Sequence, residues 1–593
     1  MEPTTTSTAP QTTTTTKLPL GQFHPKKPKW KTCTLNPDFD CASIAVPLDY
    51  TDLKGDTINL AITRKVAADK SKRIGSLIVN PGGPGGSGIE AVNGLAYELP
   101  AEITDAFDLV GFDPRGVGES DAIECITNKD AYFAQWVDDT DPASVQKGFD
   151  ANRKINEECA GNNAKLLRHL STYESAQDLD VLREAVGDKK ITYLGFSYGT
   201  RLGGVYAELF PDNIRAMVLD GAVDPNSAAD ASAGNGSAAG DSSTTTKVGD
   251  TTTTTIDPNL QQFDAAFADF ATACDKDPKC LAHAGAKKML DNIKTASLAK
   301  PLTVTGTGNK GRSATRGIVE TGVNQALYSQ DLWPALGLAL ADADKGDGTM
   351  LLALADAYAG RKPDGKYANL IDAFNAINCA DSPERPIQAD IDAAIKKISK
   401  DTPADLPKGT DCVGLPIAPF PLPDIAARLT VPVLVVGTVG DPATPYANTE
   451  KLAKALTSGV VITWEGEGHT AFPKTDCITN VVSKYLVSLT VPATDPDCPS
   501  NTVVPGDPSS SSTTAGNVTA DARSPFQVDR KQISDTFVSA FVSQGATDVQ
   551  AQCVAEKLVA AYDDMAIIRI TANIVPDGFS QTAQKIIVGC VTG

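Results

Sequence analysis

A serine between two glycines, at the end of a short apolar run, constrains this chain more than any other stretch. Residues 191–196 read Ile-Thr-Tyr-Leu-Gly-Phe, which is typical of a buried β-strand, and residues 200–210 have helical apolar spacing. Between them lies Gly195-Phe-Ser197-Tyr-Gly199. A serine at such a sharp strand-to-helix turn is held above the edge of the sheet, and the glycines let neighbouring backbone approach closely. The stretch therefore predicts a nucleophile, beside a helix N-terminus that favours negative charge.

Further apolar runs predict the sheet to which this strand belongs. Two alternating runs resemble antiparallel strands, and the later runs alternate with helical segments. Such alternation is typical of a mostly parallel central sheet with helices on both faces, and so of an α/β fold. The predicted strands cover residues 42–50, 57–65, 76–80, 107–112, 191–196, 216–221, 431–437 and 460–464.

A length of 593 residues predicts more than one domain. The strand and helix alternation stops between residues 225 and 428, where helical patterns dominate, and a large helical insertion at the edge that carries the serine is most simply a lid. The expected organisation is a disordered Thr-rich tail at 1–24, a core in two parts at 25–224 and 429–498, a helical lid at 225–428 with a low-complexity loop at 227–256, a linker at 499–524, and a small disulfide-stapled helical module at 525–593.

The 12 cysteines indicate an oxidising compartment. Their number is even, and none stands in a Cys-x-x-Cys pair. Buried free thiols in a cytosolic enzyme are the alternative. No cysteine cluster has a histidine at ligand spacing, so we expect no metal, and the sequence indicates no cofactor. Neighbours in sequence predict the disulfides Cys33–Cys41, Cys125–Cys159, Cys274–Cys280, Cys379–Cys412, Cys477–Cys498 and Cys553–Cys590.

Charge and hydropathy narrow the partners of the chain. A formal net charge of −20 argues against nucleic acid or an anionic membrane as a partner. No run of about 18 or more apolar residues occurs, so we expect no transmembrane segment. Met1-Glu-Pro followed by Thr-rich sequence resembles a start placed after a removed leader. We therefore expect a secreted or cell-envelope protein, in which the N-terminal stalk could be a tether to lipid or cell wall.

A serine nucleophile needs a base and an acid to orient that base. Of the four histidines, only His469 follows a predicted strand, in Glu465-Gly-Glu-Gly-His-Thr. Asp441 follows the preceding strand, in Gly-Asp-Pro-Ala-Thr-Pro, and would hold the imidazole tautomer. The alternatives are a structural histidine and a turn-forming Asp-Pro. The order Ser197, Asp441, His469 is that of α/β-hydrolases, which sets the expected fold.

The oxyanion hole of such a site requires two backbone N–H groups. One should come from Tyr198, directly after the nucleophile. The other should come from Gly83, in the Gly82-Gly83 pair of the glycine loop at residues 81–88, because glycine lets the backbone come close enough. A phosphate-binding loop is the rival interpretation, but Gly-Lys-Ser/Thr is missing.

Four motifs together resemble the secreted tripeptidyl aminopeptidases and related prolyl-aminopeptidase-like α/β-hydrolases of actinobacteria. The resemblance covers about residues 30–498. It implies a serine exopeptidase with a peptide substrate, a helical lid that limits access to unblocked N-termini, and triad roles for Ser197, Asp441 and His469. The motifs are Asn80-Pro-Gly-Gly-Pro-Gly-Gly-Ser-Gly, Asp113-Pro-Arg-Gly-Val-Gly-Glu-Ser, Gly195-Phe-Ser-Tyr-Gly-Thr and Gly440-Asp-Pro-Ala-Thr-Pro.

An aminopeptidase must bind a free α-ammonium group, and a carboxylate in a partly dry pocket is suited to this. We expect Asp381 to be that carboxylate, because a disulfide at Cys379 would hold it rigidly. Asp224, after the strand at 216–221, is the second candidate. In so acidic a chain, solvated surface carboxylates are the alternative for both.

Two other functions stay open. A carboxylesterase would use the same triad and oxyanion hole, without a lid group to bind an amine. A non-catalytic cell-surface binding protein could be built on the same scaffold, although an intact triad argues against it. The oligomeric state, the preferred side chains and the role of the C-terminal module are left open by the sequence.

Overall fold

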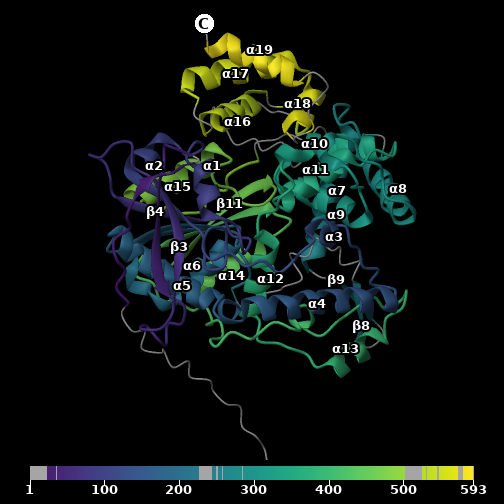
Figure 1. The fold of residues 1–593 in the computed structure, drawn as a ribbon, viewed down its shortest axis with the longest axis horizontal. Coiled ribbons are helices and arrows are strands. Elements are labelled where there is room, and N and C mark those ends of the chain that lie inside the picture. The colour runs from purple at the N-terminus through teal and green to yellow at the C-terminus, as the bar shows by residue number, and fades with distance from the viewer. Residues whose placement is uncertain are drawn as a thin grey trace, which may run out of the picture.

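The computed structural model builds the chain around one large β-sheet (Figure 1). Parts of the expected tail, low-complexity loop and linker lie outside the residues that the structure describes. Those residues are 23–34, 36–225, 243–248, 251–256, 258–283, 285–500, 524–528, 530–543, 546–571, 574 and 579–591.

The sheet has nine strands in the order β1-β2-β3-β5-β4-β6-β7-β10-β11. Strands β1 to β3 pair antiparallel, and β3 pairs antiparallel with β5. From β5 to β11 every pairing is parallel, which confirms the predicted mostly parallel sheet. The strands are β1 (Lys31–Thr32), β2 (Asp40–Pro47), β3 (Thr57–Lys65), β4 (Gly75–Asn80), β5 (Phe107–Phe112), β6 (Ile191–Phe196), β7 (Ile214–Asp220), β10 (Val433–Gly440) and β11 (Gly459–Glu467).

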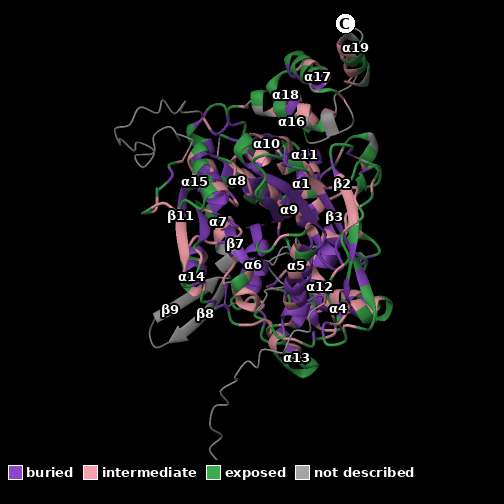
Figure 2. Ribbon diagram, turned by 90° about the vertical axis from the view of Figure 1, so that its left-hand side faces the viewer, coloured by how far each residue is buried: buried purple, intermediate pink, exposed green. Residues whose placement is uncertain are grey.

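Helices cover both faces of this sheet, and Figure 2 shows buried residues concentrated between the layers. Along β10, Val433 and Val435 pack with α5, α6 and α14, whereas Leu434 and Val436 pack with α1, α2 and α15. A strand buried on both faces must be apolar throughout, which is why these runs were readable in the sequence. The helices of the core are α1 (Gly88–Leu95), α2 (Ala101–Ala106), α3 (Lys129–Phe133), α4 (Pro142–Leu167), α5 (Thr172–Val186), α6 (Tyr198–Leu209), α14 (Ala447–Ala455) and α15 (Asp476–Ser488).

A helical insertion, defined here as residues 258–395, separates β7 from β10 in the sequence. Most of its buried side chains belong to a second hydrophobic cluster around Phe270, Trp333 and Leu351, which also includes Tyr132 and Phe133 of α3. Its helices are α7 (Pro258–Lys276), α8 (Ala286–Ala299), α9 (Arg316–Leu327), α10 (Trp333–Ala343), α11 (Thr349–Tyr358), α12 (Leu370–Asp381) and α13 (Gln388–Ile395).

A short hairpin precedes this insertion. Strands β8 (Ser243–Val248) and β9 (Thr251–Ile256) pair antiparallel, in the region where the sequence analysis expects a low-complexity loop. The expectation is wrong for these two segments. Threonine is β-branched and favours extended backbone, so a Thr-rich run can pair as strands despite its low complexity.

The C-terminal helices pack on the helical insertion beside α10, as both ribbon views show. Phe526 and Ile568 belong to the hydrophobic cluster of the insertion, with the Phe526 ring centroid 5.8 Å from that of Phe270. Arg569 forms an ion pair with Asp342 of α10 at 2.6 Å. The helices are α16 (Arg530–Ser543), α17 (Asp548–Ala561), α18 (Asp564–Thr571) and α19 (Phe579–Val591).

The cysteines of the chain form six disulfides between the neighbours in sequence. Each joins segments that are close in the chain, so each closes a short loop. The pairs are Cys33–Cys41, Cys125–Cys159, Cys274–Cys280, Cys379–Cys412, Cys477–Cys498 and Cys553–Cys590.

Candidate active site

Ser197 lies at the turn between β6 and α6, with φ 55° and ψ −124°. A positive φ is costly for a residue with a side chain, and such strain is characteristic of a functional turn. The Ser197 N–H donates to the carbonyl of Asp220 at 2.8 Å, and the Thr200 hydroxyl donates to the Ser197 carbonyl at 2.6 Å. These bonds hold the turn at the carboxyl edge of the sheet.

The two glycines around the serine are required by close backbone approach. A Cβ atom at Gly195 would lie 2.4 Å from the carbonyl oxygen of Gly199. A Cβ atom at Gly199 would lie 2.7 Å from the carbonyl oxygen of Asn80, at the end of β4. Neither position can carry a side chain without moving the turn or the neighbouring strand.

Asp441 and His469 meet at the same edge of the sheet, after β10 and β11. The Nδ1 atom of His469 lies 2.9 Å from both carboxylate oxygens of Asp441. Asp441 is buried and also accepts hydrogen bonds from the N–H groups of Ala443 and Thr444 and from the Thr444 hydroxyl. Burial acts to raise the pKa of Asp441, but His469 and these donors outweigh it and hold the pKa below its usual value.

The imidazole of His469 is enclosed by the helical insertion and by β7. The Tyr328 ring meets it edge-on, with centroids 5.4 Å apart, and the Tyr328 carbonyl accepts a bond from the His469 N–H at 2.8 Å. Gly221, directly after β7, is also close, because a Cβ atom there would lie 3.1 Å from Cε1 of the ring. The ring therefore has little freedom to leave Asp441.

A cavity of about 660 Å³ lies between the core and the helical insertion, and both Ser197 and His469 line it. Much of its wall is aromatic and comes from α3, α7, α9, α11 and α12. Charged side chains from α6, α14 and the loop after β7 line it as well. The aromatic residues are Phe133, Tyr198, Phe263, Tyr328, Tyr358 and Phe374, and the charged ones, besides His469, are Arg201, Asp224 and Lys451.

The expected oxyanion donors lie on the same cavity. Tyr198 and Gly83 both line it. A Cβ atom at Gly82 would lie 2.9 Å from the Tyr198 nitrogen, so the glycine loop packs directly on the serine turn. Asp113 secures the far end of this loop, accepting from the Ser87 hydroxyl at 2.6 Å, and burial raises the pKa of its carboxyl.

The two candidate amine-binding carboxylates differ in position. Asp224 lines the cavity and pairs with Lys451 at 2.7 Å. Asp381 is not among the residues that line it, so the structure does not bring this predicted residue to the cavity. Its buried carboxylate accepts bonds from the Thr172 N–H at 2.7 Å and the Thr172 hydroxyl at 2.5 Å, on the core side of α12. Burial raises the pKa of Asp381 to about 6.

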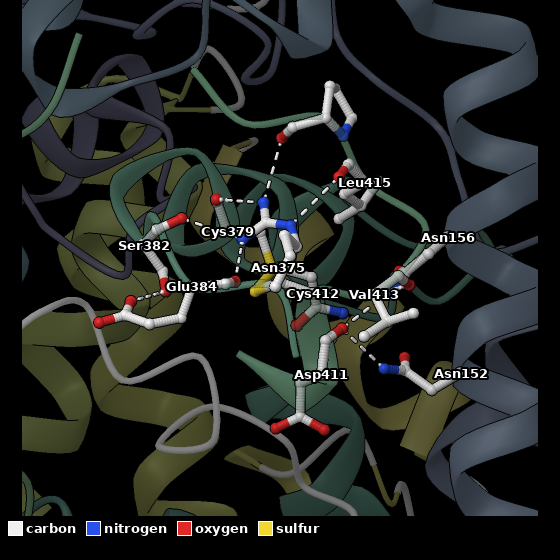
Figure 3. Close-up of a disulfide and its surroundings, with 12 residues drawn as sticks. Asn152, Asn156, Asn375, Cys379, Ser382, Glu384, Asp411, Cys412, Val413 and Leu415 are labelled. Carbon is white, nitrogen blue, oxygen red and sulfur yellow. Dashed lines mark hydrogen bonds between the residues drawn. A yellow bond between two sulfur atoms is a disulfide. The ribbon is translucent and has the colours of Figure 1, made fainter. Parts of the chain in front are cut away.

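The disulfide beside Asp381 does hold α12, as the sequence analysis expects (Figure 3). Cys379 and Cys412 are joined, and Arg385 donates to the carbonyls of Cys379, Ser382 and Leu415. Asn378 lines the cavity instead of Asp381. The helix is fixed, but the helical turn that faces the cavity lies before the predicted residue.

Asp220 is a further residue of the site that the sequence analysis missed. It ends β7 and is fully buried, and its carboxylate accepts hydrogen bonds from the loop after His469. A charged residue at the end of an otherwise apolar strand was the available signal, since the carboxyl ends of neighbouring parallel strands meet at one edge.

Comparison with known proteins places the chain in a family. Residues 75–246 match the model described as alpha/beta hydrolase fold, and residues 404–498 match the model described as TAP-like protein. The chain is 38% identical over 493 residues to serine protease Hip1 of Mycobacterium tuberculosis, an alignment that covers 77% of this chain and 87% of that protein. The chain belongs to the TAP-like α/β-hydrolases.

Two further relatives of this α/β-hydrolase carry other names. Carboxylesterase B of Mycobacterium tuberculosis is 35% identical over 478 residues, covering 77% of this chain and 86% of that protein. Tripeptidyl aminopeptidase of Streptomyces lividans is 40% identical over 216 residues, which is 33% of this chain and 38% of that protein. The predicted fold and family resemblance are confirmed, and the protein is a serine hydrolase enzyme. Among its described helices, none has the length and apolarity needed to cross a bilayer.

Proposed function

We propose that this serine hydrolase is an extracytoplasmic aminopeptidase, which releases short fragments of the dipeptide or tripeptide type from free peptide N-termini. The observation that carries the proposal is the cavity of about 660 Å³ under the helical insertion, lined by Ser197, His469 and Asp224. A site roofed in this way is accessible to chain ends more readily than to the middle of a folded polypeptide. The tripeptidyl aminopeptidase relative supports the same activity.

In this proposal Ser197 is the nucleophile, His469 the base and Asp441 the orienting acid. Because Nδ1 of His469 is bonded to Asp441, Nε2 is the nitrogen that takes the Ser197 proton. The serine oxygen bonds to the scissile carbonyl carbon, and the backbone N–H groups of Gly83 and Tyr198 stabilise the oxyanion. The carbon–nitrogen bond then breaks, with the proton passing from His469 to the leaving amine. Water releases the acyl fragment by the reverse proton path.

Asp224 is the proposed partner of the substrate's α-ammonium group. Lys451, one of its partners, has a side chain that is 54% exposed, so an ammonium group entering from the cavity can replace it at little cost. Inside the cavity the same pairing is less screened by water, which favours the substrate over the lysine.

The proposed location is outside the cytoplasm. The six disulfides support it, because such bonds persist in oxidising compartments. The net charge of −20 favours peptides over nucleic acid as partners. The proposed N-terminal tether lies in residues outside the described part of the chain.

A carboxylesterase is the second candidate, favoured by the aromatic wall of the cavity and by the relative named carboxylesterase B. A panel of tripeptidyl arylamides, their N-acetylated forms and short acyl esters separates the two functions. The aminopeptidase proposal predicts rapid cleavage of free tripeptidyl arylamides and cleavage of the acetylated forms at least about 10-fold slower. Esters as the only good substrates would establish the esterase instead.

A variant tests the amine site within the same panel. Asp224→Asn should raise KM for free-amine substrates by about 10-fold or more, the value of one desolvated ion pair, while ester hydrolysis is unchanged. Equal effects on amine and ester substrates would remove Asp224 from substrate recognition. Asp212→Asn, on the short helix before β7, is a control at an exposed carboxylate.

A further inference from the structure

Asp220 occupies the strand between the nucleophile and the acid. In the sheet, β7 lies between β6 and β10, and Asp220 is in register with Phe196 on one side and Val436 on the other. Its carbonyl accepts the hydrogen bond from the N–H of Ser197 at 2.8 Å. The backbone of Asp220 therefore fixes the height of the serine turn above the sheet.

The side chain of Asp220 binds the other half of the site. Both carboxylate oxygens lie 3.0 Å from the Ala471 nitrogen, and one lies 2.7 Å from the Phe472 nitrogen. Ala471 and Phe472 directly follow His469 and Thr470, and Thr470 has a φ of 61°. A carboxylate that accepts two backbone N–H groups in a fully buried position holds that stretch of backbone firmly.

We infer that Asp220 is a positioning residue, which sets the distance between His469 and Ser197 by binding the backbone on both sides of the reacting pair. This inference rests on the proposed triad. Asp441 acts on the imidazole itself, through Nδ1, whereas Asp220 acts on the chain that carries the imidazole. Asp441 thus fixes the tautomer of His469 and stabilises its charged form, whereas Asp220 fixes the position of the backbone that carries His469.

The pKa values of the two carboxyl groups are shifted in opposite directions, down for Asp441 and up for Asp220. Burial raises the pKa of Asp220 to about 6, against which its bonds to Phe472 and Ala471 act only in part. The charged groups that face it are Lys474 and His469, both on the loop that it binds. As the pH falls through about 6, Asp220 gains a proton and becomes a weaker acceptor for the two N–H groups. Acid therefore weakens the bonds that hold the backbone after His469.

The test compares Asp220→Asn with Asp180→Asn in the full-length protein. The Asp180 carboxylate also accepts side-chain hydrogen bonds, from Arg183, Tyr206 and Asn213. Asn213 precedes β7, so this cluster lies at the opposite edge of the sheet. For each variant we would measure the midpoint of thermal unfolding, the rate of Ser197 labelling by a fluorophosphonate, and kcat and KM.

Asp220→Asn should lower the labelling rate and kcat by about 10- to 100-fold and leave KM within about threefold, because a displaced base slows the chemical step but not binding. Asparagine does not titrate, so log kcat/KM should fall less steeply with decreasing pH in Asp220→Asn than in wild type just below pH about 6. Asp180→Asn should change only the unfolding midpoint. A residue with a merely structural role would not alter the slope.

Three outcomes overturn the inference. One is a wild-type labelling rate in Asp220→Asn, and another is an unchanged acid slope. If Asp220→Asn does not fold, the wild-type enzyme decides, because a slope no steeper than about 1 just below pH 6 in folded wild-type protein shows that the titration of Asp220 does not affect the rate. The proposed triad is tested separately by Ser197→Ala. If fluorophosphonate labelling persists in that variant, the proposed function is wrong, whatever the result for Asp220.

Discussion

Replacement of Gly82 by alanine is a direct test of the glycine loop as part of an oxyanion hole. The backbone of Gly82 has a φ of 89°, and an added Cβ atom would lie 2.4 Å from the Phe196 carbonyl oxygen and 2.9 Å from the Tyr198 nitrogen. Real Cβ contacts stay above 3.0 Å, so the loop and the serine turn must separate by roughly 0.6 Å. Both atoms belong to backbone, and neither can rotate away.

The size of the effect follows from that displacement. Gly83, the proposed donor, is the next residue of the loop and moves with it. A misplacement of about 1 Å costs on the order of 10²-fold in rate, and loss of one oxyanion donor costs about 10²- to 10³-fold in kcat. We therefore expect kcat to fall by about 10²-fold in Gly82→Ala. The unfavourable φ should also lower the free energy of unfolding by about 1–3 kcal/mol.

The assay is steady-state cleavage of the best arylamide or ester, with urea unfolding of the same preparation. Gly94→Ala is the matched control, because Gly94 lies in α1 and a Cβ atom there meets nothing within 4 Å. That variant should keep wild-type kcat and gain about 0.5–1 kcal/mol of stability, the usual benefit of alanine in a helix. A folded Gly82→Ala enzyme with kcat within threefold of wild type would refute the reasoning.

Three other predictions concern the triad, the scaffold and the buried acid of α12. Ser197→Ala should abolish fluorophosphonate labelling and lower kcat by about 10⁴-fold or more, and His469→Ala should be nearly as damaging, as measured by labelling and turnover. Arg115→Met should lower the free energy of unfolding by about 3–5 kcal/mol in urea titrations. The buried guanidinium makes two 2.7 Å hydrogen bonds to the buried carboxylate of Asp178, which the variant leaves without a partner charge. As a control, Arg64→Met breaks a partly exposed ion pair and should cost about 1 kcal/mol or less. Burial raises the pKa of Asp381 to about 6, above its unfolded value of about 4. Its contribution to stability is therefore present at pH 4 and below and is lost as the pH rises through 6. Relative to Asp381→Asn, the free energy of unfolding of the wild type should decline by about 2–3 kcal/mol across that window, and equal pH dependence in the two proteins would contradict the prediction.

The fold and the nucleophile turn could be predicted because they depend on local sequence. A strand such as Val433–Val436 is buried on both faces and must be apolar, so it stands out as a run of four buried residues. Gly195 and Gly199 are required because a Cβ atom at either position would clash with nearby backbone, and the turn consists of consecutive residues. For the same reason, motifs at the carboxyl ends of parallel strands could be assigned to one edge of the sheet.

The position of Asp381 relative to the cavity could not be predicted from the sequence. Which side of α12 faces the cavity depends on how that helix is packed by Thr172 on the core and by the Cys379–Cys412 disulfide. Neither constraint has a signature in the sequence around residue 381, because both partners are distant in the chain. Asp220 was missed for a related reason: its partners, Ala471 and Phe472, come from a loop that the long insertion separates from β7.

The contact of Phe526 with the helical insertion has a consequence for the order in which the molecule is assembled. Phe526 packs on Phe270 and Trp333, and Ile568 joins the same cluster, so the last helices of the chain supply part of the insertion's interior. During synthesis those side chains emerge only after the sheet, the triad loops and the insertion have all been made. Contacts between segments so distant in the chain also close slowly, because the intervening polypeptide must be ordered first. The hydrophobic cluster of the insertion is therefore completed only once Phe526 and Ile568 have been made, and a polypeptide that stops before Phe526 leaves Phe270 and Trp333 without their contacts to Phe526.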